Sequence, residues 1–237
     1  MDTGIQIRQL GNDTWIFEEQ GVRFFLLTGS HRALLIDSGM MTHNAKDLAE
    51  KLTDLPLSLL NTHADPDHIG SNAQFDAFYM SPAEAVNYYH TRQGRGEILP
   101  IWDGDELDLG DRKLRMVEMP GHTPGSLAVI DLKYRRAFTG DPIQRHGRIF
   151  MFGIHREMHA YRLSLKKLYG HVADFDEIYP SHADAPIAPD IILDLWDAAG
   201  RIMEGKIEGH DEEMHGTPIT AYDVGFTTFL CDRRSAF

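Results

Sequence analysis

One nine-residue segment, Thr62–Gly70, restricts the fold of this chain more than any other. It reads Thr-His-Ala-Asp-Pro-Asp-His-Ile-Gly and places two histidines and two aspartates within six residues. The short apolar run Leu57–Leu60 precedes it and predicts a buried strand. We therefore expect these four polar side chains at the end of a strand, in the loop that leads to a helix beginning near Ile69.

The chemistry of this segment favours a metal site. Imidazole and carboxylate groups suit zinc, manganese or iron. Alternate side chains of such a loop can turn inward, so that His63 and Asp65 could bind one ion and Asp67 and His68 a second. The alternative is a polar loop at the start of a helix, in which Asp65 or Asp67 caps the helix by accepting from its first amides.

Three later segments add further candidate ligands. His122 lies between two Pro/Gly turns, Asp141 follows a Thr-Gly pair, and His182 follows a Pro-Ser pair. Each residue alone could be an ordinary turn residue. All three follow strand-like runs, however, and a sheet sandwich exposes such strand ends along one rim, where a site can form.

Strand-like and helix-like segments alternate along both halves of the chain. We expect strands at Thr14–Phe17, Phe24–Leu27, Ala33–Ile36, Leu57–Leu60, Leu107–Leu109, Leu114–Glu118, Leu127–Leu132, Ala137–Thr139 and Glu177–Tyr179, and a hairpin of Ile219–Tyr222 with Phe226–Leu230. We expect helices at Ala45–Leu52, Ile69–Ala73, Pro82–His90, Met158–Tyr169 and Ile191–Ile207. This alternation favours helices packed outside a central sheet sandwich. No shift in composition marks a linker, so we expect a single domain over residues 1–237.

The order and spacing of these motifs resemble those of the metallo-β-lactamase superfamily. The resemblance covers almost the whole chain and includes the early segment Leu35–Gly39, which contains Asp37. It implies an α+β fold of the αββα type, a four-layer sandwich of two mixed sheets flanked by helices. It also implies two divalent metal ions, with zinc as the first expectation and manganese or iron as alternatives.

The resemblance further assigns roles to particular residues. The implied metal ligands are His63, Asp65 and His122 for a first ion, Asp67, His68 and His182 for a second, and Asp141 as a bridge between the two. Asp37 matches a buried acid that supports the ligands without binding metal. Asp67 would orient a hydroxide shared by the two ions, and His182 or a metal-bound water could pass a proton to the leaving group.

Asp65 departs from the family pattern, which usually has a second histidine at this position. A third carboxylate should make a bridging water harder to deprotonate and should shift the preference toward manganese or iron. A carboxylate near this position resembles the di-iron flavoprotein branch, which uses Glu there. Loss of the first ion is another possible outcome.

The composition of the chain limits the kinds of partner that it is expected to bind. A formal net charge of −13 argues against a nucleic-acid backbone as the main partner, because such binding rests on Lys and Arg. The apolar runs are too short to span a bilayer, and Cys231, the single cysteine, excludes an intrachain disulfide. The first residues have neither a basic nor an apolar region, so we expect no signal peptide and a cytoplasmic location.

These observations predict a metal-dependent hydrolase that acts on an ester, thioester, lactone or phosphodiester of a small molecule. Arg145, His146 and His155 lie between two candidate ligands in sequence and are candidate substrate contacts, although an ordinary surface loop fits them equally. The alternatives are a di-iron redox protein with an external electron donor and a non-catalytic binding protein on the same fold. The sequence does not predict an oligomeric state.

Overall fold

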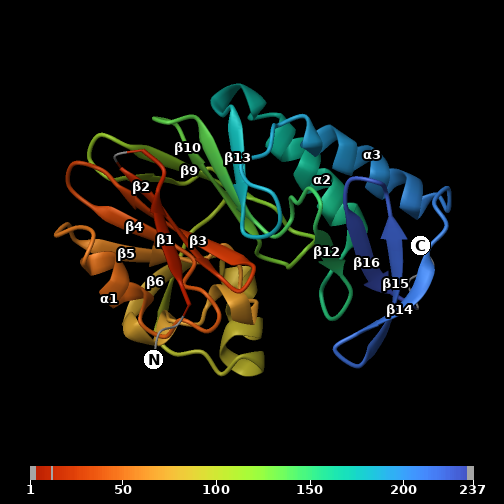
Figure 1. Ribbon diagram of the computed structural model, residues 1–237, viewed down its shortest axis with the longest axis horizontal. Coiled ribbons are helices and arrows are strands. Elements are labelled where there is room, and N and C mark those ends of the chain that lie inside the picture. The colour runs from red at the N-terminus through yellow and green to blue at the C-terminus, as the bar shows by residue number, and fades with distance from the viewer. Residues whose placement is uncertain (1–3, 12, 234–237) are drawn as a thin grey trace.

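Two β-sheets packed face to face form the centre of the molecule, and helices cover their outer faces (Figure 1). The computed structural model describes residues 4–11 and 13–233. The first sheet contains, in spatial order, β1 (Gln6–Gln9), β2 (Thr14–Glu19), β3 (Val22–Thr28), β4 (Ala33–Ile36), β5 (Leu57–Leu60), β6 (Ala77–Met80) and β7 (Glu97–Pro100). The second contains β13 (Glu177–Pro180), β11 (Arg136–Gly140), β10 (Leu127–Asp131), β9 (Lys113–Glu118) and β8 (Glu106–Asp108). Both sheets are mixed, as predicted.

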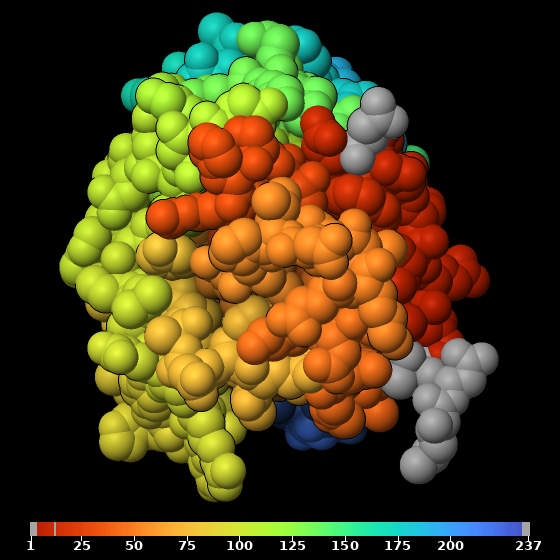
Figure 2. Space-filling view, turned by 90° about the vertical axis from the view of Figure 1, so that its left-hand side faces the viewer, coloured from red at the N-terminus to blue at the C-terminus, as the bar shows by residue number. Residues whose placement is uncertain are grey.

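Alternate side chains of β4 pack into two different apolar cores, one on each face of the first sheet. Leu34 and Ile36 belong to the apolar core between the two sheets. Leu35 belongs instead to a second core, which it shares with Ala45 and Ala49 of helix α1 (Ala45–Glu50). Successive side chains of a strand point to opposite faces, so a strand covered on both sides is a continuous apolar run. In Figure 2, the orange segment that contains α1 lies on the face turned toward the viewer.

Two longer helices, α2 (Met158–Tyr169) and α3 (Ile191–Met203), cover the outer face of the second sheet. Tyr161 of α2 and Leu195 of α3 share a third buried cluster with Ile130 of β10. Glu157 precedes helix α2, and its carboxylate accepts hydrogen bonds from amides in the first turn of the helix. These contacts complete the predicted order of helix, sheet, sheet and helix.

A third, smaller sheet was not predicted. It contains β12 (Arg148–Met151), β16 (Thr228–Asp232), β15 (Thr217–Asp223) and β14 (His210–Met214), and it lies beside α2 and α3 (Figure 1). The sequence indicated only the β15–β16 hairpin. Strand β14 is mostly charged and exposed, and it therefore lacks the apolar alternation by which a strand is identified.

Three of the predicted helices were wrong in type or length. The segments expected at Ile69–Ala73 and Pro82–His90 form short 3₁₀ turns at Asn72–Gln74 and Pro82–Glu84, followed by a wider turn at Asn87–Thr91. Helix α3 ends at Met203 rather than Ile207, and the left-handed backbone of Gly205 follows its last residue.

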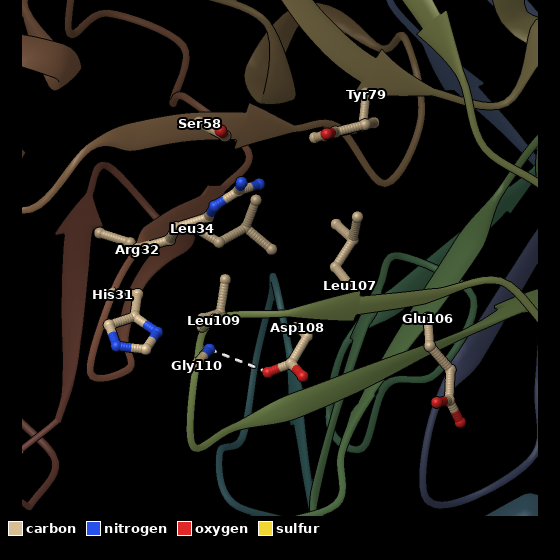
Figure 3. A pocket seen from close by; sticks show the side chains of 11 residues that line it. His31, Arg32, Leu34, Ser58, Tyr79, Glu106, Leu107, Asp108, Leu109 and Gly110 are labelled. Carbon is tan, nitrogen blue, oxygen red and sulfur yellow. Dashed lines mark hydrogen bonds between the residues drawn. The ribbon is translucent and has the colours of Figure 1, made fainter.

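The rim of the sandwich at the beginning of β4 contains a pocket of about 500 Å³ (Figure 3). Its lining includes Arg32 and Leu34 at the beginning of β4, Ser58 of β5, and Glu106 and Asp108 of β8. Asp37 and His63 follow the opposite ends of β4 and β5. The pocket is therefore separate from the candidate ligands. Among the helices of residues 4–11 and 13–233, none combines the length and apolar character needed to cross a membrane.

The buried guanidinium of Arg112 ties the two sheets together. It contacts Asp131 at the end of β10 at 2.6 Å, and it donates to Thr14 Oγ1 and to the Thr28 carbonyl in the first sheet. Both charged side chains are fully buried. The pair is acceptable in the core only because each charge has a partner.

We predict that Arg112→Ala lowers the free energy of unfolding by about 3–5 kcal/mol, because it leaves the Asp131 charge buried and unpaired. Denaturant unfolding followed by circular dichroism measures this change. Arg201→Ala is the control, because Arg201 forms an exposed contact of 3.9 Å with Asp197 and should change stability by less than about 1 kcal/mol. Equal effects of the two variants would contradict the prediction.

Candidate metal centre

The seven predicted ligands lie together at one rim of the sandwich, in two adjoining groups. The first group contains four residues, Asp67, His68, Asp141 and His182, and the second contains His63, Asp65 and His122. Within each group, the candidate ligand atoms lie within 4.8 Å of one another. We call them the four-residue group and the three-residue group.

Asp141 lies between the two groups. Its Oδ1 is 3.1 Å from Nε2 of both His68 and His182. Its Oδ2 is 3.5 Å from His122 Nε2 and 3.8 Å from His63 Nε2. The position agrees with the bridging role that the family resemblance implies for this carboxylate.

Parallel strand pairing explains why residues far apart in the sequence meet here. Strands β4 and β5 are parallel with Ile36 beside Leu60, so Asp37 comes next to the segment that begins the ligand loop. Strands β11 and β13 are also parallel, and Gly140 beside Pro180 brings Asp141 close to His182. The carboxyl ends of parallel neighbours lie on the same edge of a sheet, where ligand sites are commonly found.

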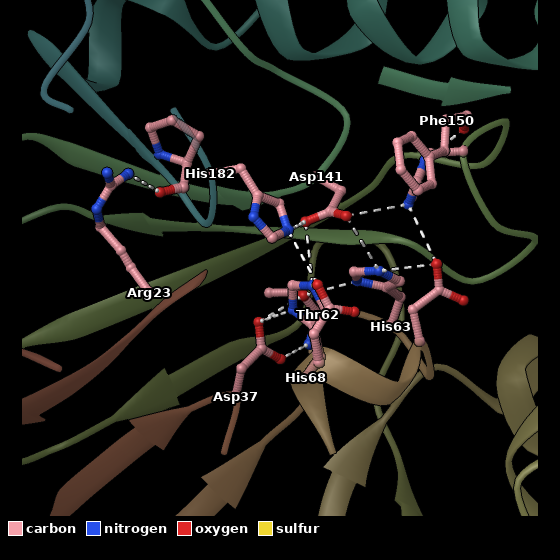
Figure 4. Close-up of polar contacts among 12 residues, drawn as sticks. Arg23, Asp37, Thr62, His63, His68, Asp141, Phe150 and His182 are labelled. Carbon is pink, nitrogen blue, oxygen red and sulfur yellow. Dashed lines mark hydrogen bonds and ion pairs between the residues drawn. The ribbon is translucent and has the colours of Figure 1, made fainter. Parts of the chain in front are cut away.

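Each of the four histidines is held through Nδ1, with Nε2 turned toward the carboxylates (Figure 4). The partners of Nδ1 are Thr62 Oγ1 for His63 (3.0 Å), Asp37 Oδ2 for His68 (2.8 Å), the Phe150 carbonyl for His122 (2.8 Å) and the Gly21 carbonyl for His182 (2.8 Å). Carbonyl and carboxylate oxygens only accept, so Nδ1 of the last three carries the hydrogen. Thr62 Oγ1 donates to Asp37 and therefore accepts from His63. Such partners fix the orientation of metal-binding histidines.

Three inward-facing atoms are unsatisfied. Nε2 of His63, Nε2 of His68 and Oδ1 of Asp141 are buried and have no hydrogen-bond partner among the residues that the structure describes. A buried polar atom without a partner costs free energy, and native proteins rarely leave several together. Two imidazole lone pairs and a carboxylate oxygen form a donor set that fits a divalent cation.

Strong electrostatic coupling accompanies this geometry. Burial lowers the pKa of His182, but Asp141 and Asp67 outweigh it and raise the pKa to about 10. The same balance raises the pKa of His68 well above its usual value. Burial raises the pKa of Asp141, but His182 and His68 hold it well below the ordinary range. In the three-residue group, burial and then Arg156 lower the pKa of His122 to about 3.

Asp65 does not cap a helix. It precedes the short 3₁₀ turn Pro66–His68, but its carboxylate accepts no hydrogen bond from that turn. Its oxygens instead face two arginines, at 2.6 Å from Arg156 and 3.5 Å from Arg92. For Asp65 the capping alternative is therefore wrong, and the structure reveals two basic neighbours that the sequence interpretation missed.

Glu84 is another residue that the sequence interpretation missed. It is fully buried, and its two carboxylate oxygens accept from the backbone amides of Ala64 (3.0 Å) and Gly125 (2.7 Å). It therefore joins the loop that carries His63 to the loop that carries His122. No spacing signal links Glu84 to those loops, whereas Arg156 lies directly beside the predicted contact His155 and could have been considered with it.

The predicted substrate residues lie outside the two groups. Arg145 is 3.9 Å from Asp190, and the exposed His146 contacts Asp184 at 2.7 Å. His155 is exposed in the loop that leads to Arg156. Their contact with a substrate stays a prediction.

Comparisons with known proteins agree with the fold and the motif order. The model of the metallo-beta-lactamase superfamily matches residues 19–208, and the chain belongs to this superfamily. A metallo-beta-lactamase from Pontibacter korlensis superimposes with a TM-score of 0.69 at 14% identity, over 83% of this chain and 99% of that chain. The predicted αββα fold is thereby confirmed.

Several curated relatives are hydrolases. The acyl-coenzyme A thioesterase MBLAC2 of Gallus gallus is 28% identical over 171 residues, 54% of this chain and 62% of that protein. The hydroxyacylglutathione hydrolase of Gloeobacter violaceus is 33% identical over 135 residues, 53% and 52% of the two chains. The atrochrysone carboxyl ACP thioesterase nsrC of Aspergillus novofumigatus is 25% identical over 205 residues, 85% and 59% of the two chains. The matched region thus spans 52–62% of the length of these relatives.

Metal binding to the metal-free chain should release protons, because His182, whose Nε2 belongs to the ligand set, has a pKa of about 10. The apparent affinity should therefore rise with pH from neutrality toward about 10. Zinc titrations by calorimetry, in buffers of different ionisation enthalpy at pH 7, give the number of protons released. His182→Ala should release fewer protons, and a heat that does not depend on the buffer would contradict the prediction.

Asp37→Asn should weaken metal binding by about 10–100-fold, as expected when the hydrogen-bond partner of a histidine ligand is altered. Asp37 has a left-handed backbone with φ of 63°, which Asn tolerates, so the fold should survive. Competition with a chelator of known affinity measures the change. Asp47→Asn, on the exposed face of α1, is the control, and equal affinity of both variants would show that Asp37 does not support the site.

Proposed function

We propose that this chain is a divalent-metal-dependent hydrolase that cleaves a thioester bond of a small molecule. The observation that carries the proposal is the set of unsatisfied, inward-facing atoms on His63, His68 and Asp141. The relatives that are acyl-coenzyme A and acyl-carrier-protein thioesterases favour a thioester over the ester, lactone and phosphodiester alternatives.

One ion would be held by the four-residue group, and the sequence prediction of a second ion places it at the three-residue group. Zinc is the first expectation for the metal, with manganese or iron as alternatives. Bound divalent ions of this kind supply a Lewis acid for a carbonyl oxygen and make water available as a nucleophile near neutral pH. A small-molecule partner and a cytoplasmic location also stay predictions.

Asp67 and His182 are the ligand candidates best placed to meet a substrate. About a quarter of each side chain is exposed, at 24% and 23%, whereas His63 and His68 are fully buried. Asp67 Oδ2 lies 3.1 Å from His182 Nε2. Asp67 would accept a hydrogen bond from the attacking water and orient it toward the carbonyl carbon.

Water would supply the proton for the leaving group, because Nε2 of His182 would bind the ion and could not carry that proton. Its ring is held at Nδ1 by the Gly21 carbonyl, so its Nε2 faces both Asp141 and the solvent-accessible side of the group. A thiolate is a good leaving group that needs little help from an acid. A thioester therefore needs less acid catalysis than an ester or phosphodiester would.

Asp67→Asn should lower kcat on the best substrate by at least about 100-fold, because it removes a charge that orients the nucleophile. The assay is a panel of acyl-coenzyme A and hydroxyacylglutathione thioesters, a carboxyl ester, a lactone and a phosphodiester, each with the metal-loaded chain. Asp54→Asn, at an exposed position, should keep the activity of the parent chain.

The outcomes separate the alternatives. Faster hydrolysis of thioesters than of the other substrate classes supports the proposal. Faster hydrolysis of another class would change the proposed substrate but not the proposed metal-dependent hydrolase function. If no member of the panel is hydrolysed by a folded, metal-loaded chain, the hydrolase proposal fails in favour of a redox or non-catalytic function. Retention of most of kcat in Asp67→Asn, with unchanged circular dichroism, would remove Asp67 from the mechanism.

A further inference from the structure

The guanidinium of Arg156 lies within the three-residue group. Its Nη2 is 2.6 Å from Asp65 Oδ2, and its Nη1 is 2.9 and 3.0 Å from the two ring nitrogens of His122. Nη1 also donates to the backbone carbonyl of His122 at 2.7 Å. The side chains of Arg156 and Asp65 are only 12% and 11% exposed. A guanidinium with this many close contacts, nearly out of solvent, is part of the site.

These contacts involve the atoms that an ion in this group would need. Nδ1 of His122 faces the Phe150 carbonyl, so Nε2 carries the free lone pair of the ring, and Nη1 of the guanidinium lies over this ring, 3.0 Å from Nε2. Asp65 Oδ2 makes its shortest contact with the same guanidinium. His63 Nε2 is then the remaining unsatisfied ligand atom of the group within the described chain. Together with Asp141 Oδ2, which lies 3.8 Å away, this atom gives two ligands, whereas protein zinc sites use at least three protein ligands.

The ligand atoms of the four-residue group have no contact with the Arg156 guanidinium among the contacts of the described residues. His68 Nε2 and Asp141 Oδ1 face each other at 3.1 Å, and neither has a hydrogen-bond partner in the described residues. Asp67 and His182 complete the group, and the contacts of the Arg156 guanidinium are with Asp65, His122 and the Phe150 carbonyl. The group therefore retains a complete ligand set for one ion.

Charge explains why Asp65 and Arg156 belong together. Asp65 replaces the neutral histidine that the family usually has, and so adds a negative charge that is almost fully buried. A buried carboxylate requires a cationic partner, which Arg156 provides. A divalent ion beside the same guanidinium would be repelled, because both are cations at close range in a poorly solvated site.

We propose that Arg156 takes the place of the first ion, so that the chain binds one divalent ion, at the four-residue group. The inference rests on the proposed metal-dependent function and replaces the expected pair of ions by one ion and one guanidinium. A guanidinium cannot act as a metal does on water, but its planar N–H donors suit a carbonyl or carboxylate oxygen. Arg156 is thus a positioning residue that holds Asp65 and presents a fixed positive charge beside the ion.

The number of metal equivalents that the chain retains tests whether it binds one ion or two. The chain is saturated with zinc, and in a parallel sample with manganese, freed of unbound metal, and measured by elemental analysis. The wild type should retain one equivalent. The double variant Asp65→His/Arg156→Gln should retain two, because it restores the usual ligand and removes the guanidinium.

Two further variants make the count specific to Arg156. Arg156→Lys keeps a positive charge near Asp65 and should retain one equivalent. Arg92→Gln removes the other arginine near Asp65, which is 3.5 Å away and more exposed, and should also retain one. Circular dichroism and thermal melting establish that each variant is folded before its metal is counted.

Two equivalents in the wild type would overturn the inference, whatever the variants show. One equivalent in a folded double variant would also overturn it, because Arg156 would then not be what excludes the second ion. If the double variant does not fold, the metal counts of the wild type and of Arg156→Lys still decide whether the chain binds one ion or two. Metal counts do not depend on turnover: a chain with one ion and no hydrolysis refutes only the hydrolase function, and an active chain with two ions refutes only the role of Arg156.

Discussion

The carboxylate of Asp37 is the contact on which the ligand geometry depends. It accepts from the amide and hydroxyl of Thr62 and from Nδ1 of His68, at 2.7–2.8 Å. One acid at the end of β4 thereby fixes both ends of the loop that follows β5. The loop supplies four candidate ligands, and the parallel pairing of β4 with β5 sets its position. The residue that makes these three hydrogen bonds has a left-handed backbone, with φ of 63°.

The two sheets contribute to the site in different ways. The first sheet carries the dense ligand loop, whereas the second contributes single residues after separate strands. Glu84 and the amide of Leu127, which donates to the Thr62 carbonyl, connect the two contributions. Packing of apolar faces alone would let the sheets slide relative to each other. These directional contacts between loops determine which residues meet.

Much of this arrangement could be predicted from the sequence, for physical reasons that also explain the omissions. Runs such as Ala33–Ile36 identify buried strands, and polar residues directly after them must lie at the rim. The partners of the histidines could not be found in this way, because the Phe150 and Gly21 carbonyls belong to the backbone and have no residue signature. Strand β12, which supplies the Phe150 carbonyl, was missed because it begins with an exposed arginine and is not buried throughout, unlike the continuous apolar run Ala33–Ile36. Arg156 was missed because its role depends on a contact across 91 positions of the chain.

The attachment of His182 has a consequence for how an ion is exchanged. Its ring is held by the Gly21 carbonyl in the β2–β3 turn, and Arg23 holds the carbonyl of Pro180 in the segment before it (Figure 4). The other three candidate histidine ligands are anchored by a side chain or by strand β12, and they are fully buried. Opening of this one hairpin turn would free a single ligand while both sheets stay intact. The lifetime of a bound ion should therefore follow the local motion of the hairpin rather than the global stability of the fold.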